Sequence, residues 1–217
     1  MSELDRLAER YRAHHESSRG RELVWGGTER ARLFARLVGG PGRRVLDLGC
    51  RYGALTAAYA AGNDVVGVDA DRAALAEASA ALGIETQWAD VEQSLDFPDA
   101  SFDVVVAGEL LEHLREPDTL VAEVYRLLRR GGRFVGSVPN AFRLKNRLRF
   151  LAGRRPETDP THLHVFTPTD VRTLLSDFEA VELHFVSSRF LGLHPRLMAN
   201  ILVFTGVKPR PGLVRVR

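Results

Sequence analysis

The chain has 217 residues, a formal net charge of +2 and a sequence pI of about 9.0, so it is only mildly basic. A dedicated nucleic-acid binder carries a much stronger basic bias, and nucleic acid is not expected as a partner. Cys50 is the one cysteine, which excludes an internal disulfide and indicates a reducing compartment. The charged start over residues 1–5 does not resemble a signal peptide, and no apolar run reaches the length of a membrane span. We therefore expect a cytoplasmic protein that forms a single domain over residues 1–217.

The first 40 residues predict an N-terminal helical cap. Leu4, Leu7 and Tyr11 recur at helical spacing, and Thr28 is a suitable N-cap for a helix over 29–38. Residues 1–24 have no place in the sheet described below. We expect them to fold over the bound ligands and to exclude water.

Strand and helix patterns alternate through the centre of the chain. Buried strands are expected at about 44–48, 64–68, 84–88, 102–107 and 133–138. Helices are expected at 53–61, 71–82 and 117–129, the last ending on cations and Gly131-Gly132. This alternation predicts an α/β fold with a doubly wound, Rossmann-like sheet and helices on both faces.

The last third of the chain interrupts this rhythm. Residues 140–166 form an apparent insertion with a basic helix over 141–152 and a loop rich in Pro, Thr and His. A helix over 168–176 follows. The strand patterns at 179–187 and 199–207 leave no room for a crossover helix, so they predict an antiparallel terminal hairpin and seven strands in all.

The glycine loop after the first strand is the strongest functional signal. Glycines let backbone N–H groups approach a ligand closely, and Asp69 at the end of the second strand can accept from both hydroxyls of a ribose. Asp47 directly precedes the glycines. An anion there disfavours a pyrophosphate and favours a cationic amino acid or sulfonium. These features predict half of a nucleoside-binding site.

The spacing Asp47-x-Gly49-x-x-x-Gly53, followed by Asp69 and Asp90, resembles the class I S-adenosylmethionine-dependent methyltransferases over roughly residues 43–207. The resemblance implies S-adenosylmethionine as cofactor, with Asp69 on the ribose and Asp90 accepting from the adenine amino group. Either acid alone could instead be a turn residue or a helix cap. The cofactor-binding residues that the resemblance implies are Asp47, Gly49, Cys50, Arg51, Gly53, Asp69, Ala70, Asp90, Val91 and Gly108.

Arg51 departs from the family pattern, because it stands where the middle glycine usually lies. If that position needs a positive φ, a side chain there costs about 1–2 kcal/mol. The loop is then either relaxed here or holds a strained arginine. The guanidinium either points to solvent or meets the carboxylate of the ligand's methionine moiety.

The segment Glu109-x-x-Glu112-His113 follows the fourth strand. It resembles the ubiquinone-pathway O-methyltransferases and the small-RNA 3′-terminal 2′-O-methyltransferases. In both groups these residues are linked to a divalent metal, with a further histidine from downstream. The resemblance implies Mg²⁺, Mn²⁺ or Zn²⁺ held by Glu109, Glu112, His113 and His162, with His164 as the substitute for His162.

His113 could also act without a metal. A helical segment would place residues 109, 112 and 113 on one face, but many relatives with this pair have no known metal. His113 would then be a general base or a substrate contact, or it would be structural. We name it as the catalytic residue.

Together these patterns predict methyl transfer from S-adenosylmethionine to a hydroxyl of a small or lipid-like acceptor. The alternatives are an RNA or amine methyltransferase, and a non-catalytic domain that binds cofactor or partner. Residues 143–155 carry six cations and no acid, with Leu144, Leu148 and Leu151 on one helical face. This segment is a solvated surface helix, a peripheral membrane contact or a site for an acidic acceptor. Neither the acceptor's identity nor the oligomeric state follows from the sequence.

Overall fold

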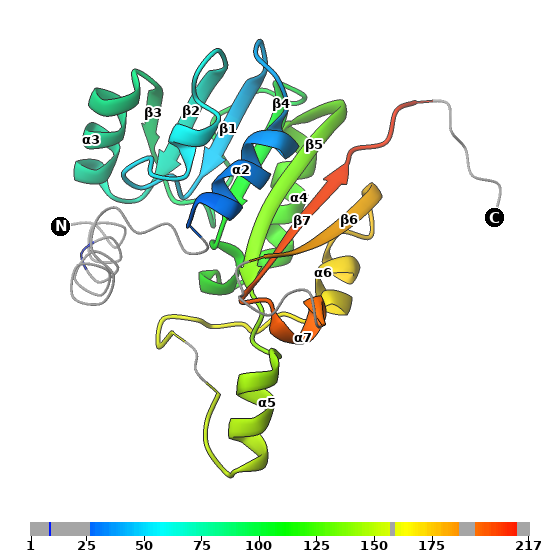
Figure 1. Ribbon diagram of the computed structural model, residues 1–217. Coiled ribbons are helices and arrows are strands. Elements are labelled where there is room, and N and C mark those ends of the chain that lie inside the picture. Colours follow the sequence, from blue (N-terminus) through cyan, green and yellow to red (C-terminus); the bar gives the residue numbers. More distant parts are fainter. Residues whose placement is uncertain (1–8, 10–26, 157–158, 187–193, 212–217) are drawn as a thin grey trace.

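The computed structural model describes Glu9 and residues 27–156, 159–186 and 194–211 (Figure 1). The lid expected over residues 1–24 lies outside the described residues, apart from Glu9. The helix expected over 29–38 is confirmed as α2 (Gly27–Val38).

Seven strands form one twisted sheet in the order β3-β2-β1-β4-β5-β7-β6. The five N-terminal strands pair in parallel, whereas β7 runs antiparallel to both β5 and β6. The predicted fold class, including the antiparallel terminal hairpin, is therefore confirmed. The strands are β1 (Arg44–Leu48), β2 (Asp64–Asp69), β3 (Glu85–Trp88), β4 (Phe102–Gly108), β5 (Leu128–Pro139), β6 (Glu179–Val186) and β7 (Ile201–Val207).

Helices cover both faces of the sheet, because each face carries its own apolar core. α2 and α3 (Arg72–Leu82) contribute Phe34 and Ala78 to one core. On the opposite face, α4 (Pro117–Leu127) and α6 (Pro168–Leu174) contribute Leu120 and Val171 to the other. The short α7 (Pro195–Met198) precedes β7. None of the helices in the described residues is both long and apolar enough to cross a membrane.

The prediction of a helix over residues 53–61 is wrong. Only the single 3₁₀ turn η1 (Thr56–Ala58) forms there. The Asn63 side chain donates to the Tyr59 carbonyl at 2.7 Å, and Gly62 then reverses the chain with a φ of 78°. The Asn63 bond and the positive φ of Gly62 end the helical conformation after a single turn.

The helix expected over 117–129 ends two residues early, at Leu127, and β5 begins at once. The ammonium of Lys208 donates to the carbonyls of Tyr125 (2.6 Å) and Leu128 (2.8 Å). Lys208, which follows β7 in the sequence, thus donates to carbonyls that a longer helix would have paired with its own N–H groups. The residues around the helix end do not indicate a partner that is so distant in the sequence.

Candidate cofactor and catalytic site

The loop after β1 holds three residues with positive φ: Gly49 (72°), Arg51 (49°) and Gly53 (76°). The Gly49 N–H donates to the Val68 carbonyl at 2.8 Å, which ties the loop to β2. Arg51 is therefore in the strained, left-handed conformation, and the relaxed-loop interpretation is wrong. Its guanidinium lies 5.2 Å from the centre of the Tyr52 ring.

Asp69 holds this loop in place from the end of β2. One carboxylate oxygen accepts from the Arg51 N–H (3.0 Å), and the other accepts from the Asp71 N–H (2.9 Å). Burial raises the pKa of Asp69, and these two bonds oppose that rise. A carboxylate oxygen accepts more than one hydrogen bond, so Asp69 can serve the loop and a ribose together.

Asp47 is almost completely buried, with only 3% of its surface exposed. The hydroxyls of Thr56 (2.6 Å) and Tyr59 (2.7 Å) both donate to its Oδ2 atom. Desolvation nevertheless raises its pKa from 3.8 to about 6. A cation arriving beside it would favour the charged form, so the site is built to gain from a positively charged ligand.

Arg30 on α2 is a site residue that the sequence reasoning missed. It is 4% exposed, and its positive charge acts against the raised pKa of Asp47. A Cβ on Gly108 would stand 2.8 Å from its Nη2 atom, so a larger residue at the end of β4 would displace the guanidinium. A signal was present: Arg30 begins the helical stripe that Leu33, Phe34 and Leu37 continue into the core.

The expected adenine end is built by the ends of β2 and β3. The Trp88 indole donates to the Ala70 carbonyl at 2.8 Å, and the Arg72 guanidinium lies 3.6 Å from the Trp88 ring centre. Asp90 accepts from the Glu92 N–H at 2.9 Å, as a turn residue does. Asp90 therefore shapes the loop, while Trp88 is a second residue of this region that the sequence reasoning did not single out.

The other expected cofactor residues lie around the same edge of the sheet. Cys50 is buried, and burial raises the pKa of its thiol. A Cβ on Gly67 would meet its sulfur at 2.7 Å, so the cysteine is packed against β2. Val91 packs against the core on the α4 side.

The helical premise for residues 109–113 is wrong, because only the 3₁₀ turn η2 (Leu111–His113) forms. Glu109 has a φ of 59°, and its N–H donates to the Ser137 carbonyl of β5 at 2.9 Å. The backbone therefore kinks at Glu109, which breaks the continuous helical face on which the four-ligand set depended.

Glu112, His113 and His162 nevertheless lie together, with one potential ligand atom from each within 4.8 Å of the others. Glu109 and His164 are not part of this group. The ring centres of His113 and His162 are 4.8 Å apart. Donor atoms 2.0–2.6 Å from one ion lie at most about 5 Å apart, so the three residues fit a divalent metal.

The loop after α5 brings His162 to this place. The N–H groups of Leu163 (2.8 Å) and His164 (3.1 Å) donate to the Glu112 carbonyl. His164 itself points to the Arg115 carbonyl, 3.2 Å from its Nε2 atom. These backbone bonds set the register that turns His162 inward and His164 aside.

Thr161 determines the tautomer of His113. The Nδ1 atom lies 3.3 Å from the Thr161 carbonyl oxygen, which can only accept. It also lies 3.2 Å from the Thr161 hydroxyl, which donates to Asp159 at 2.7 Å. Nδ1 therefore carries the proton, and Nε2 carries the lone pair that a base or a metal ligand needs.

An open α/β sheet with a glycine loop after its first strand and an acid at the end of its second is typical of nucleoside-binding domains. Residues 46–136 match the family described as methyltransferase domain. A "Probable S-adenosylmethionine-dependent methyltransferase" of Mycolicibacterium smegmatis is 36% identical over 137 residues, which are 62% of this chain and 50% of that protein. A ubiquinone biosynthesis O-methyltransferase of Alkalilimnicola ehrlichii is 38% identical over 113 residues, 49% of this chain and 46% of that protein.

A solved structure of an S-adenosylmethionine-dependent methyltransferase from Archaeoglobus fulgidus shares the fold, with a TM-score of 0.70 at 21% identity. The match covers 91% of this chain and 99% of that one. The chain spans about half the length of the two curated relatives. Residues 46–136 thus match the methyltransferase-domain family, and the described residues share the fold of a solved S-adenosylmethionine-dependent methyltransferase.

Proposed function

We propose that this chain transfers the methyl group of S-adenosylmethionine to a hydroxyl of a small or lipid-like acceptor. The observation that carries the proposal is the imidazole of His113, whose Nδ1 atom lies against the carbonyl oxygen and hydroxyl of Thr161, so that Nε2 is the atom that would take the acceptor's proton. A hydroxyl must lose its proton during methylation, and histidine titrates in the range where that transfer is efficient.

The binding roles follow from charge. Asp47 would lie against the cationic end of the methionine moiety, and the buried Arg30 would meet its carboxylate. Asp69 would accept from the ribose hydroxyls, and Ala70 with Trp88 would border the adenine. The cofactor supplies an activated methyl group, so these residues need only align the reactants and exclude water.

A divalent metal is the alternative to direct base catalysis, because an Nε2 atom of His113 that binds an ion cannot also accept a proton. Glu112, His113 and His162 suit such an ion together. These three residues would hold the ion, and it would lower the pKa of the acceptor hydroxyl. Glu109 drops out of the expected ligand set because it lies outside the cluster.

The test is a transfer assay with methyl-labelled S-adenosylmethionine and a panel of phenols and long-chain hydroxy compounds. We expect label in at least one hydroxyl acceptor, and loss of transfer in His113→Gln with cofactor binding retained. Transfer that stops on exhaustive chelation and returns with Mg²⁺, Mn²⁺ or Zn²⁺ would support the metal. Label in RNA or amines alone, or cofactor binding without any transfer, would contradict hydroxyl methylation.

A further inference from the structure

The exposed apolar side chains of this molecule gather in one segment. Among the described residues, every large hydrophobic side chain that is exposed lies between positions 142 and 165. Scattered exposed leucines are ordinary, but a gathered set marks a surface that contacts something apolar. The set is Phe142 (39% exposed), Leu148 (56%), Phe150 (72%), Leu151 (81%), Leu163 (59%) and Val165 (50%).

The helix α5 (Leu144–Leu151) carries the three side chains central to this set, and it projects away from the sheet at the foot of the molecule (Figure 1). Its one buried residue is polar: Asn146 is 3% exposed and donates to the Ala141 carbonyl at 2.9 Å. The helix thus turns an amide inward while Leu148, Phe150 and Leu151 face out. This is the reverse of a helix that packs on its own domain.

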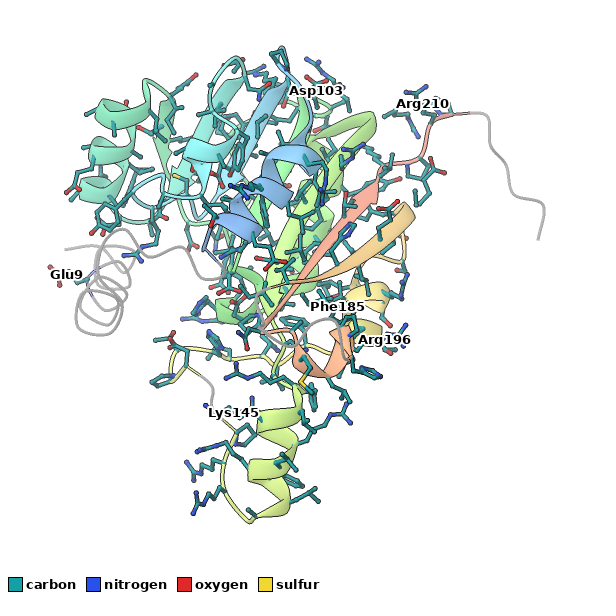
Figure 2. The ribbon with its side chains drawn as sticks, viewed as in Figure 1. Glu9, Asp103, Lys145, Phe185, Arg196 and Arg210 are labelled. Carbon is teal, nitrogen blue, oxygen red and sulfur yellow. The ribbon has the colours of Figure 1, made fainter. Side chains whose placement is uncertain are left out.

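Cations alternate with these apolar side chains along the segment. Residues 143–155 contain no acid, and the six cations are Arg143, Lys145, Arg147, Arg149, Arg154 and Arg155. Figure 2 marks Lys145 on α5, among side chains that spread outward from the helix.

Two of the arginines also stiffen the segment. The Nε atom of Arg147 donates to the Phe142 carbonyl at 2.7 Å, and that of Arg149 donates to the Arg155 carbonyl at 3.0 Å. The helix and the turn after it are therefore ordered before any partner binds, so binding need not fix their conformation.

From these observations we propose that α5 and the turn after it dock on the surface of an anionic lipid bilayer. Leu148, Phe150 and Leu151 would enter the boundary between headgroups and acyl chains, and the cations would contact lipid phosphates. Charge complementarity selects this partner, because a cationic rim around protruding leucine and phenylalanine side chains matches an anionic, apolar-centred surface. Nucleic acid offers the negative charge but no apolar phase for these side chains to enter.

Docking through α5 would also bring the candidate site close to the bilayer. The loop that follows α5 carries Leu163, whose N–H donates to the Glu112 carbonyl of the candidate site at 2.8 Å. A bilayer that covers Leu163 as well as α5 would lie beside that site. The docking surface itself does not depend on the proposed reaction, and it is tested without turnover.

The test is co-sedimentation of the whole chain with vesicles of phosphatidylcholine alone and of equal parts phosphatidylglycerol and phosphatidylcholine. We expect binding to the anionic vesicles, weakening as salt is raised, and at least tenfold weaker binding to the neutral ones. Replacing Leu148, Phe150 and Leu151 together by serine should lower the partition coefficient at least tenfold. All three side chains are exposed, so the circular dichroism melting curve should not change.

A charge variant and its matched control separate specific docking from general attraction. Arg154→Gln with Arg155→Gln should weaken binding several-fold. Arg32→Gln with Arg36→Gln, which removes exposed cations from α2 instead, should leave it unchanged. The proposal is overturned if the chain ignores anionic vesicles, if the serine variant binds as well as the original, or if the α2 variant loses as much binding as the charge variant.

Discussion

Asp47→Asn separates the stability of this domain from its function. The asparagine has the same shape, and its amide oxygen can still accept from Thr56 and Tyr59. The substitution removes the charge that burial disfavours, and it puts an amide NH2 group in place of the other carboxylate oxygen. We therefore expect the variant to be more stable than the original protein at neutral pH and to bind S-adenosylmethionine more weakly.

The size of the stability effect follows from the pKa of Asp47, which rises from 3.8 to about 6 on burial. That rise corresponds to about 3 kcal/mol against the charged carboxylate in the folded state. Below pH 3.8 the group is protonated in both the folded and unfolded chains, so it contributes no difference. Between pH 3.8 and about 6 the unfolded chain loses its proton first, which favours unfolding. Above that range the full loss of unfolding free energy, about 3 kcal/mol, is present.

Urea unfolding of both proteins from pH 4 to pH 8 measures this directly. The variant's advantage in unfolding free energy should grow from near zero at pH 4 to at most about 3 kcal/mol at pH 7.5. Asp177→Asn, which changes an exposed acid between α6 and β6, is the control and should show no such trend. A constant difference across pH, or an advantage of the variant that is smaller at pH 7.5 than at pH 4, would refute the reasoning.

Calorimetry completes the first prediction. Loss of a charge-assisted contact to the cationic ligand should weaken S-adenosylmethionine binding by about 1.5–3 kcal/mol, or roughly 10- to 150-fold. Adenosine lacks the methionine moiety, so its affinity should not change. Equal weakening of both ligands would mean that Asp47 shapes the loop rather than meeting the cation.

Four further predictions concern other residues of the site. Arg51→Gly should raise the unfolding free energy by about 0.5–1 kcal/mol, because it relieves the positive φ at the entropic cost of one glycine; a destabilised variant in urea melts would show that the stacking on Tyr52 matters more. Asp69→Ala should weaken both S-adenosylmethionine and S-adenosylhomocysteine by roughly 1.5–3 kcal/mol in calorimetry, and undiminished binding would remove it from the site. Arg30→Met should weaken S-adenosylmethionine about tenfold or more while sparing adenosine, so equal loss for both would count against a carboxylate contact. His113→Gln should abolish transfer to the acceptor and leave the cofactor affinity within about twofold, and a variant that still turns over would exclude the base.

The sheet could be predicted because its strands are short buried runs, and the acids mark where those runs end. Asp47 and Asp69 were found by this pattern. What local pattern could not supply was the partner of each group. Thr56 and Tyr59 bond Asp47 across nine and twelve residues, and a 3₁₀ turn forms where a helix over 53–61 was expected.

The candidate catalytic residues also could not be grouped correctly from local sequence patterns. Helical spacing grouped Glu109 with Glu112 and His113, but a bond from Glu109 to β5 kinks the backbone and removes it from the cluster. His162 lies beside His113 because backbone hydrogen bonds join segments about 50 residues apart. Hydrophobic periodicity in the sequence does not predict such bonds. Family resemblance named His162, and the register of the loop is what turns that residue inward.

The most direct test of the account is a crystal structure of the chain with S-adenosylhomocysteine bound. It should show the ribose hydroxyls on Asp69, the methionine carboxylate on the guanidinium of Arg30, and the amino acid end against Asp47. The ligand's sulfur should face the His113 imidazole across the space for an acceptor. A ligand bound elsewhere, or a ribose that does not touch Asp69, would contradict the central claim.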